Sequence, residues 1–312
     1  MKEIIVDKNN SGQKLPQLLK KILTEASMGF IYKMLRKKNI TLNDKKASGD
    51  EVVRESDVIK IFFSDETFLK LSGQENKGLE YDLLKNLPHD INIIYQDNDK
   101  IIINKPVGLL SQKAKEEDVS INEMAISYMI NSGCLTLEQY NIFHPSIVNR
   151  LDRNTSGIIV FAKNLSAAQK LSREIKDRSA IKMYRTIVKG QILNESTING
   201  YLYKDEETNT VTILDNEYLD AKQIITTYNP ISYNPVLDLT YLEVHLVTGR
   251  THQIRAHLSS IGHPILGDNK YGDIKLNNTY NRKYQLLHAY SIQFCDGSKY
   301  IAEIPEDYNV YI

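Results

Sequence analysis

One acidic side chain stands between two arginines where Arg150, Leu151, Asp152 and Arg153 follow each other. Turn-forming residues come next, and the apolar run 158–161 follows them directly. A charge at the edge of a core must be paired or take part in chemistry, because burying it unpaired is costly. Asp152 is therefore a structural aspartate whose oxygens accept loop N–H groups, or a catalytic carboxylate with an arginine partner. The spacing alone favours the structural role.

Other enzyme chemistries leave signatures that this sequence lacks. It contains no Gly-rich phosphate-binding loop and no His-Glu-x-x-His pair. His252 and His257 are five residues apart, so they do not share a helix face as ligands at i and i+4 would. Ser156 lacks the flanking glycines of a nucleophile elbow. These observations argue against metal, nucleotide and serine-hydrolase chemistry, and we expect neither a metal nor a cofactor.

Length and composition predict a globular protein. A chain of 312 residues with 41% hydrophobic residues can form one large domain or two unequal ones. No apolar run approaches the roughly 18 residues that span a bilayer, and the N-terminus lacks the apolar segment of a signal peptide. Cys134 and Cys295 are too few for a disulfide framework or a zinc site. We expect a cytoplasmic monomer with reduced thiols and no membrane contact.

Positive charge is concentrated in two parts of the sequence, although the formal net charge is zero. Residues 14–54 hold ten Lys or Arg and four Asp or Glu, a net of +6. Residues 65–140 hold seven and thirteen, a net of −6, and residues 149–190 hold ten and three, a net of +7. Two basic segments can form a nucleic-acid surface on a neutral protein. Solvated faces give the same pattern, and the charge distribution by itself favours that simpler explanation.

The first 63 residues have the pattern of a small unit made of two helices and a sheet. A short strand is expected at Ile4–Val6, and basic helices are expected within 12–26 and 27–40. Strand-like runs separated by Asn, Asp and Gly turn residues follow. This order resembles the alpha-L RNA-binding module of a small-subunit ribosomal protein, tyrosyl-tRNA synthetases and several RNA-modifying enzymes. The candidates for RNA phosphate contacts, whose alternative role is solubility alone, are Lys33, Arg36, Lys37 and Lys38.

Residues 64–90 are polar and weakly periodic, which predicts a linker that includes a short helix at Leu79–Leu87. A second domain is expected over 91–312. It should begin with a hairpin around 96–100 and a helix at Ser120–Met129, and continue as an irregular stretch to Ile147.

Strands dominate the rest of this second domain. The apolar patterns predict a strand over 157–164, a helix from Ser166, a strand over 182–190, strands within 197–248 with turns at 205–209, 215–217 and 229–235, a helix over 248–263 ended by Gly262 and Pro264, and a last strand at Leu286–Phe294. The order of strands is mainly that of a meander. We therefore predict an α+β protein: the small helix-helix-sheet unit, then a catalytic domain with a mixed, largely antiparallel sheet flanked by helices and loops.

Four stretches together carry a family resemblance. They are "RLDRNTSGIIVFAKN" from Arg150, "KMYRTIVKG" from Lys182, "GRTHQIRAHLSSIGHPILGDNKYG" from Gly249 and "YQLLHAYSIQF" from Tyr284. In order and spacing they resemble the RluA-type family of ribosomal RNA pseudouridine synthases, which often carry the alpha-L module. The resemblance covers nearly the whole chain, and the first and third stretches are its most specific parts.

The resemblance implies a role for five side chains. Asp152 corresponds to the catalytic carboxylate, and Arg255 to the arginine that pairs with it. Tyr184 would lie against the flipped base, and Leu287 would pack in the pocket. Arg150 would help to fill the gap that the target nucleotide leaves in the stack.

The sequence departs from the family pattern at Asn149, where a histidine usually precedes Arg-Leu-Asp. Asparagine can hydrogen-bond to backbone or phosphate but does not titrate, so we expect a positioning role near the substrate. Arg250 and His252 of the third stretch are further candidates for substrate binding.

This chemistry would explain the residue types. Isomerising uridine to pseudouridine moves a glycosidic bond from N1 to C5 and adds no atoms or electrons, so it needs no cofactor. An ionised carboxylate can attack C1′ or remove a sugar proton, and an adjacent arginine favours the charged form. A flat phenol suits the extruded base. The alternatives are a non-catalytic RNA-binding or ribosome-assembly factor with the same fold, which Asn149 leaves open, and an unrelated carboxylate hydrolase, which would need a second acid or a metal.

Overall fold

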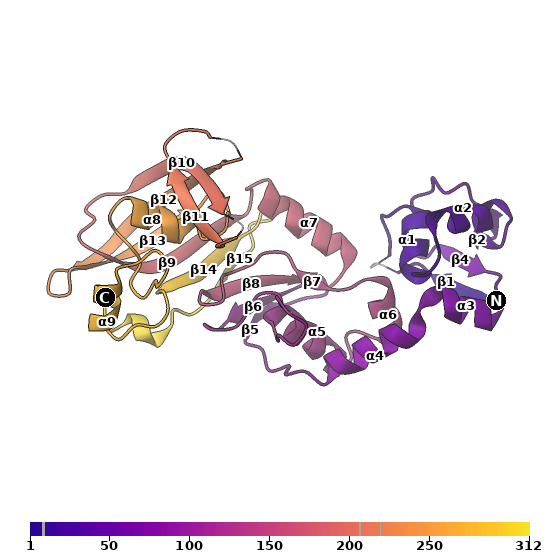
Figure 1. Cartoon of the computed structure of the whole chain (residues 1–312). Helices are drawn as coiled ribbons and strands as arrows, with labels where there is room; N and C mark the ends of the chain where they lie inside the picture. The colour runs from indigo at the N-terminus through magenta and orange to yellow at the C-terminus, as the bar shows by residue number, and fades with distance from the viewer. Residues whose placement is uncertain (8–9, 206, 219) are drawn as a thin grey trace.

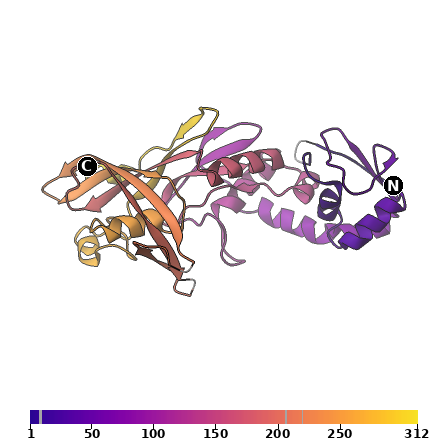
Figure 2. The same cartoon turned by 90° about the horizontal axis from the view of Figure 1, so that it is seen from above.

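Two separate β-sheets organise the chain in the computed structural model, which describes residues 1–7, 10–205, 207–218 and 220–312. A four-stranded sheet belongs to the N-terminal part, and an 11-stranded sheet belongs to the rest. The two sheets lie at opposite ends of an elongated molecule (Figure 1), and the view from above keeps them apart (Figure 2). A small unit is thus followed by a larger one, as predicted.

The N-terminal unit encloses its own apolar core. Its elements are β1 (Lys2–Ile5), α1 (Leu15–Ile22), α2 (Met28–Arg36), β2 (Ile40–Leu42), β3 (Lys45–Lys46) and β4 (Val58–Ile61). The antiparallel strand order is β1-β4-β2-β3. Leu15, Leu18, Leu19 and Ile22 recur at helical spacing, and all four are buried in this core. Both expected helices are present.

Two helices, α3 (Asp65–Ser72) and α4 (Gln74–Lys85), fill most of the segment that was predicted as a linker. They connect the two sheet units in both views (Figures 1 and 2). Ser64 caps α3 by accepting the N–H of Thr67, and Gly73, at φ 60°, separates the helices. The predicted linker with one short helix was wrong in extent, because α3 buries few side chains and has a weak apolar period.

The large sheet is almost entirely antiparallel. Its strands are β5 (Ile93–Gln96), β6 (Lys100–Lys105), β7 (Ser146–Ile147), β8 (Ser156–Ala162), β9 (Ile181–Lys189), β10 (Ser196–Asp205), β11 (Thr210–Leu214), β12 (Lys222–Asn234), β13 (Leu239–Leu246), β14 (Leu287–Gln293) and β15 (Lys299–Ile301). The main path is β11-β10-β12-β13-β9-β14-β8-β6-β5, with β15 beside β14 and β7 beside β8. Among the strand pairs that the structure describes, only β14 and β8 are parallel. This confirms the mixed, largely antiparallel sheet.

Helices cover both faces of the β6–β8 part of this sheet. Helix α5 (Ile121–Asn131) packs against Ile101 and Ile103, and α7 (Leu165–Lys176) packs on the opposite face against Ile102. This alternation follows from the two-residue period of a strand. The other helices are α6 (Leu137–Ile142), α8 (Gln253–Ser260), α9 (Ile274–Thr279) and a 3-10 turn at Glu306–Tyr308.

Two local predictions failed because helix caps were misjudged. Asn164, not Ser166, caps α7 by accepting a backbone N–H with its side chain. The stretch predicted as irregular contains α6 and β7, and a capping box formed by Thr136 and Gln139 starts α6.

Two further predictions failed in the second half of the chain. The turn predicted at 229–235 lies later, because a bulge between Pro230 and Ser232 allows β12 to continue to Asn234. Helix α8 does not extend over 248–263; it begins at Gln253, because His252 has a left-handed backbone conformation with φ 54°. Helix α9 and strand β15 had no prediction.

A glycine permits the parallel pairing of β8 with β14. Gly157 of β8 lies opposite Ala289 of β14 with φ +106°, and a Cβ at this position would lie 2.3 Å from the carbonyl oxygen of Ala289. Only glycine tolerates this approach. The pairing places β14, which begins with Leu287, next to the strand that follows the Asp152 loop.

Candidate active site

Asp152 lies in a loop that hydrogen bonds hold from two sides. The hydroxyl of Ser111 accepts the N–H of Leu151 at 2.9 Å and donates to its carbonyl at 2.7 Å. The ammonium of Lys105 donates to the carbonyl of Arg153 at 3.1 Å. The backbone on both sides of Asp152 is therefore fixed, which orients its carboxylate.

Lys105 is fully buried beneath this loop. Its ammonium also donates to the carbonyls of Pro106 and Leu109 at 2.9 and 2.8 Å, so three carbonyl oxygens satisfy its three N–H groups. Burial lowers the pKa of Lys105 to about 8, and the charge of Asp152 opposes the shift. Lys105 thus supports the loop from within the core.

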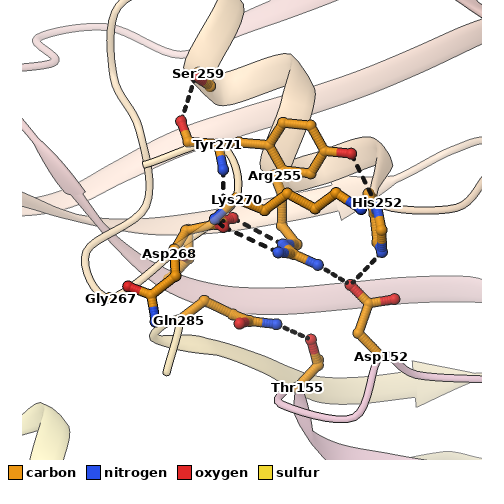
Figure 3. A network of polar contacts seen from close by, with 12 residues as sticks. Asp152, Thr155, His252, Arg255, Ser259, Gly267, Asp268, Lys270, Tyr271 and Gln285 are labelled. Carbon is orange, nitrogen blue, oxygen red and sulfur yellow. Dashed lines mark hydrogen bonds and ion pairs between the residues drawn. The ribbon is translucent and has the colours of Figure 1, made fainter. Parts of the chain in front are cut away.

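Arg255 joins the Asp152 loop to helix α8. Its Nη1 donates to Oδ2 of Asp152 at 2.7 Å, while its Nε and Nη2 donate to the two carboxylate oxygens of Asp268 at 2.7 and 2.9 Å. Figure 3 shows the guanidinium between the two carboxylates. Arg255 and Asp268 are buried, whereas the side chain of Asp152 keeps 27% of its accessible surface. One carboxylate of the network therefore remains open to a ligand.

The pKa shifts of Arg255 and Asp268 both favour the charged forms. Burial acts to lower the pKa of Arg255, but the hydrogen bonds and charges of Asp268 and Asp152 outweigh it and raise the pKa above its ordinary value. Burial acts to raise the pKa of Asp268, but Arg255 and two backbone N–H groups hold it below its usual range. Asp268 therefore supplies Arg255 with a permanent counter-charge.

His252 and Tyr271 close another side of the site. Nε2 of His252 lies 3.8 Å from Oδ2 of Asp152, and its Nδ1 lies 2.9 Å from the hydroxyl of Tyr271. Burial lowers the pKa of His252, and the positive charges of Arg255 and Lys270 lower it further against the pull of Asp152. The imidazole is therefore neutral at pH 7, and its contact with Asp152 is polar rather than ionic.

A buried apolar cluster, to which Leu151 belongs, lies beside the Asp152 loop. Tyr184 on β9, Leu287 on β14 and Leu151 are buried in one core cluster. Tyr184 makes no hydrogen bond to any residue that the structure describes, yet it lies close enough to Asp152 to be affected by its charge. Burial, followed by that charge, raises the pKa of Tyr184 above the ordinary value of a phenol. The structure thus brings together all three predicted catalytic residues, and Leu287 belongs to the same core cluster as Tyr184.

The other predicted substrate-binding residues occupy different positions. Arg150 is exposed beside the loop. Arg250 is exposed just before α8 and lines a surface pocket of about 700 Å³. The side-chain amide of Asn149 is directed at its own fold: it donates to the carbonyl of Ile158 at 3.0 Å and accepts the N–H of Val160 at 2.8 Å.

The four predicted RNA-binding residues lie far along the chain from this site, in the N-terminal unit. All are exposed: Lys33, Arg36, Lys37 and Lys38. Helix α2 ends at Arg36, so Lys37 caps it and Lys38, at φ 65°, begins the next turn. The four cations therefore cluster at one end of α2 rather than along one helical face.

Sequence reasoning missed Asp268, Tyr271 and Lys105. Asp268 and Tyr271 are part of the stretch "GDNKYG", and the need of a buried arginine for a second acid was the available signal. Lys105 interrupts an apolar strand, "IIINKP", where a charge needs buried acceptors.

No group of three or more potential metal ligands occurs among the residues that the structure describes. Within the same residues, no helix is both long and apolar enough to cross a membrane.

The chain is similar to known proteins along nearly its whole length. A solved structure of human RNA pseudouridylate synthase domain containing 1 matches 70% of this chain and 84% of its own, with a TM-score of 0.55 and 22% identity, which shows a shared fold. The family of RNA pseudouridylate synthases matches residues 99–260.

Two relatives extend this match. An uncharacterized RNA pseudouridine synthase of Mycoplasma genitalium is 31% identical, with 94% of this chain and 88% of the relative covered. The ribosomal large subunit pseudouridine synthase C of Rickettsia conorii is 33% identical, with 97% of each covered. The chain belongs to the RNA pseudouridylate synthase family, and its enzymatic activity is that of a pseudouridine synthase.

Proposed function

We propose that this enzyme isomerises specific uridines of large-subunit ribosomal RNA, and that Asp152 carries the chemistry. The printed names of several relatives, including that of Rickettsia conorii, support the choice of RNA. The observation that supports the residue is the ion pair of a partly open Asp152 carboxylate with a buried Arg255, where the charge of Asp152 also acts on the buried Tyr184.

The proposed reaction assigns a task to each part of the site. The bond between C1′ and N1 breaks, the uracil turns, a bond between C1′ and C5 forms, C5 loses its proton and N1 gains one. Asp152 attacks C1′ or removes a sugar proton, and both routes need an oriented carboxylate. Tyr184 supports the extruded base, and Arg150 fills the gap in the stack. Asn149 positions the loop through its two bonds to β8.

We also propose that residues 1–63 form an RNA-binding domain, that 64–90 connect it, and that 91–312 form the catalytic domain. Four exposed cations at the end of α2 support phosphate binding by the first domain. With ribosomal RNA as the proposed substrate, we expect the enzyme to act in the cytoplasm and as a monomer.

The test is pseudouridine mapping on ribosomal and transfer RNA from cells that lack the protein, restored with the native chain or with Asp152→Asn. We expect particular ribosomal sites to disappear and only the native chain to restore them. Restoration by both chains would remove Asp152 from the chemistry. Loss of sites in transfer RNA alone would assign transfer RNA, not ribosomal RNA, as the substrate. Defective ribosome assembly without any lost site would favour a non-catalytic factor.

A further inference from the structure

Lys182 lies beside the proposed base platform and has no ionic partner. It precedes Tyr184 by two residues on β9, so both side chains project from the same face of the sheet, with Cα atoms roughly 7 Å apart. That separation is of the order of one nucleotide of an extended strand. A cation here is therefore placed to meet the backbone next to a base that contacts Tyr184.

The ammonium of Lys182 is held against the loop that precedes α8. Its Nζ lies 3.4 Å from the point that a Cβ on Gly249 would occupy, and Arg250 follows Gly249. The charge of Arg178, in the turn after α7, also acts on Lys182. Lys182 and Arg178 therefore lie close enough for their charges to interact, and no carboxylate among the described residues pairs with Lys182.

Three other lysines that are partly or fully buried have partners. Lys100 pairs with Asp97 at 3.0 Å and Lys189 pairs with Asp273 at 2.8 Å, while Lys105 donates to three carbonyls. Lys182 is partly buried without any such acceptor.

The cost of this arrangement is visible in its electrostatics. Burial lowers the pKa of Lys182, and Arg178 adds to the shift. Burial and the charge of Lys182 likewise lower the pKa of the neighbouring His245. Partial burial removes some of the hydration of this ammonium without supplying a carboxylate, and an anion at this position would favour its charged form.

We propose that Lys182, supported by Arg178, binds an RNA phosphodiester adjacent to the target uridine. The inference rests on the proposed function, because the anion is taken to be part of the RNA whose uracil lies on Tyr184. The contact would fix the position of the flipped nucleotide. Because only one of the two phosphates that flank the target uridine would be bound, the RNA strand could bind in one direction only.

The first experiment compares Lys182→Met with Lys182→Arg and with Lys299→Met, which removes an exposed lysine on the edge strand β15. The substrate is a synthetic RNA hairpin that contains a uridine identified by the mapping. We expect Lys182→Met to lower kcat/KM roughly 10- to 100-fold, as loss of a charge-assisted hydrogen bond does. Lys182→Arg should retain most activity, and Lys299→Met should stay within about twofold of the native enzyme.

Stability separates this role from a structural one. The thermal unfolding midpoint of Lys182→Met should equal or exceed that of the native protein, because the variant removes an unpaired charge. If Lys182→Met had a lower unfolding midpoint and lost activity in proportion to the unfolded fraction, Lys182 would be a structural residue and the proposal would be overturned.

The second experiment neutralises the phosphate instead of the lysine. Each phosphodiester flanking the target is replaced in turn by a methylphosphonate. At one of the two positions, the methylphosphonate should lower kcat/KM of the native enzyme as much as Lys182→Met lowers it on normal RNA. The same methylphosphonate should not lower kcat/KM of Lys182→Met any further. Full additivity at both positions would overturn the proposal. A native enzyme that forms no pseudouridine in any RNA would instead refute the proposed function, before the variants are compared.

Discussion

Nη1 of Arg255 lies 2.7 Å from Oδ2 of Asp152, and the opposite edge of the same guanidinium is occupied by Asp268. Because Asp268 occupies the Nε–Nη2 edge, Nη1 is the nitrogen that Arg255 presents to Asp152. Asp268 is itself held by the N–H groups of Lys270 and Tyr271 at 2.8 and 3.1 Å. The orientation of Asp152 is thus set by a rigid chain of contacts that begins in the loop after α8.

Asp268→Asn should reduce the rate of the chemical step more than RNA binding. The change keeps the shape of the side chain but removes the charge that holds Arg255 in place. We expect kcat to fall roughly 10- to 100-fold while KM changes by less than about twofold. The matched control is Asp273→Asn, which alters an aspartate that caps α9 and pairs with Lys189; its kcat should be unchanged. Equal effects of both changes would remove Asp268 from this role.

Tyr184→Phe should keep RNA affinity and slow loss of the C5 proton. Burial raises the pKa of Tyr184, so its phenol is protonated at pH 7. The phenol oxygen can accept the C5 proton only if it gives its own proton to another group, and the carboxylate of Asp152 is close enough for its charge to act on Tyr184. Removing the hydroxyl should slow release of tritium from C5 by about 100-fold, the scale of general acid–base catalysis. Tyr184→Leu should in addition weaken binding, since the flat ring is lost. Unchanged tritium release by Tyr184→Phe would assign the residue to base stacking alone.

The residues that would take part in the chemistry could be predicted from the sequence, whereas the residues that hold them in position could not. Asp152, Arg255, Tyr184 and Leu287 stand in the stretches that carry the family resemblance, which assigned their roles. The fold pairs Asp152 with Arg255 and buries Tyr184 and Leu287 in one cluster. Asp268 stands in one of the same stretches, but its importance depends on which face of Arg255 it occupies. That geometry is set by the loop between α8 and α9, about which the residue pattern is silent.

The fold was predictable where burial imposes a period. The strands around Ile101 and Ile159 alternate between two buried faces and were recognised. Helix α3 buries little, and its capping by Ser64 gives only a local signal. The extension of β12 past Pro230 depends on a bulge against β13, whereas Pro230 in the sequence was taken as a turn signal.

Gly157→Ala should destabilise the protein far more than the same change at another glycine with a positive φ angle. A methyl group at Gly157 collides with the backbone of Ala289, which cannot move without separating β8 from β14. Gly133 also has a positive φ, 74°, but has open space around it. We expect a loss of more than about 3 kcal/mol for Gly157→Ala and about 1 kcal/mol for Gly133→Ala in chemical unfolding. Similar losses would show that the β8–β14 contact adapts.

Neutralising the end of α2 should weaken RNA binding without affecting the fold. The change converts Lys33, Arg36, Lys37 and Lys38 to Gln, and all four are exposed. Each phosphate contact that is lost should reduce the slope of log affinity against log salt by about one, so the slope should flatten by up to about four. The control converts four exposed lysines outside this cluster, Lys85, Lys170, Lys275 and Lys299, to Gln and matches the change in net charge. Affinity for ribosomal RNA fragments, titrated at several salt concentrations, should fall for the first variant only. If both variants lose affinity alike, net charge rather than a specific surface binds the RNA, and the N-terminal unit has no special part in recognition.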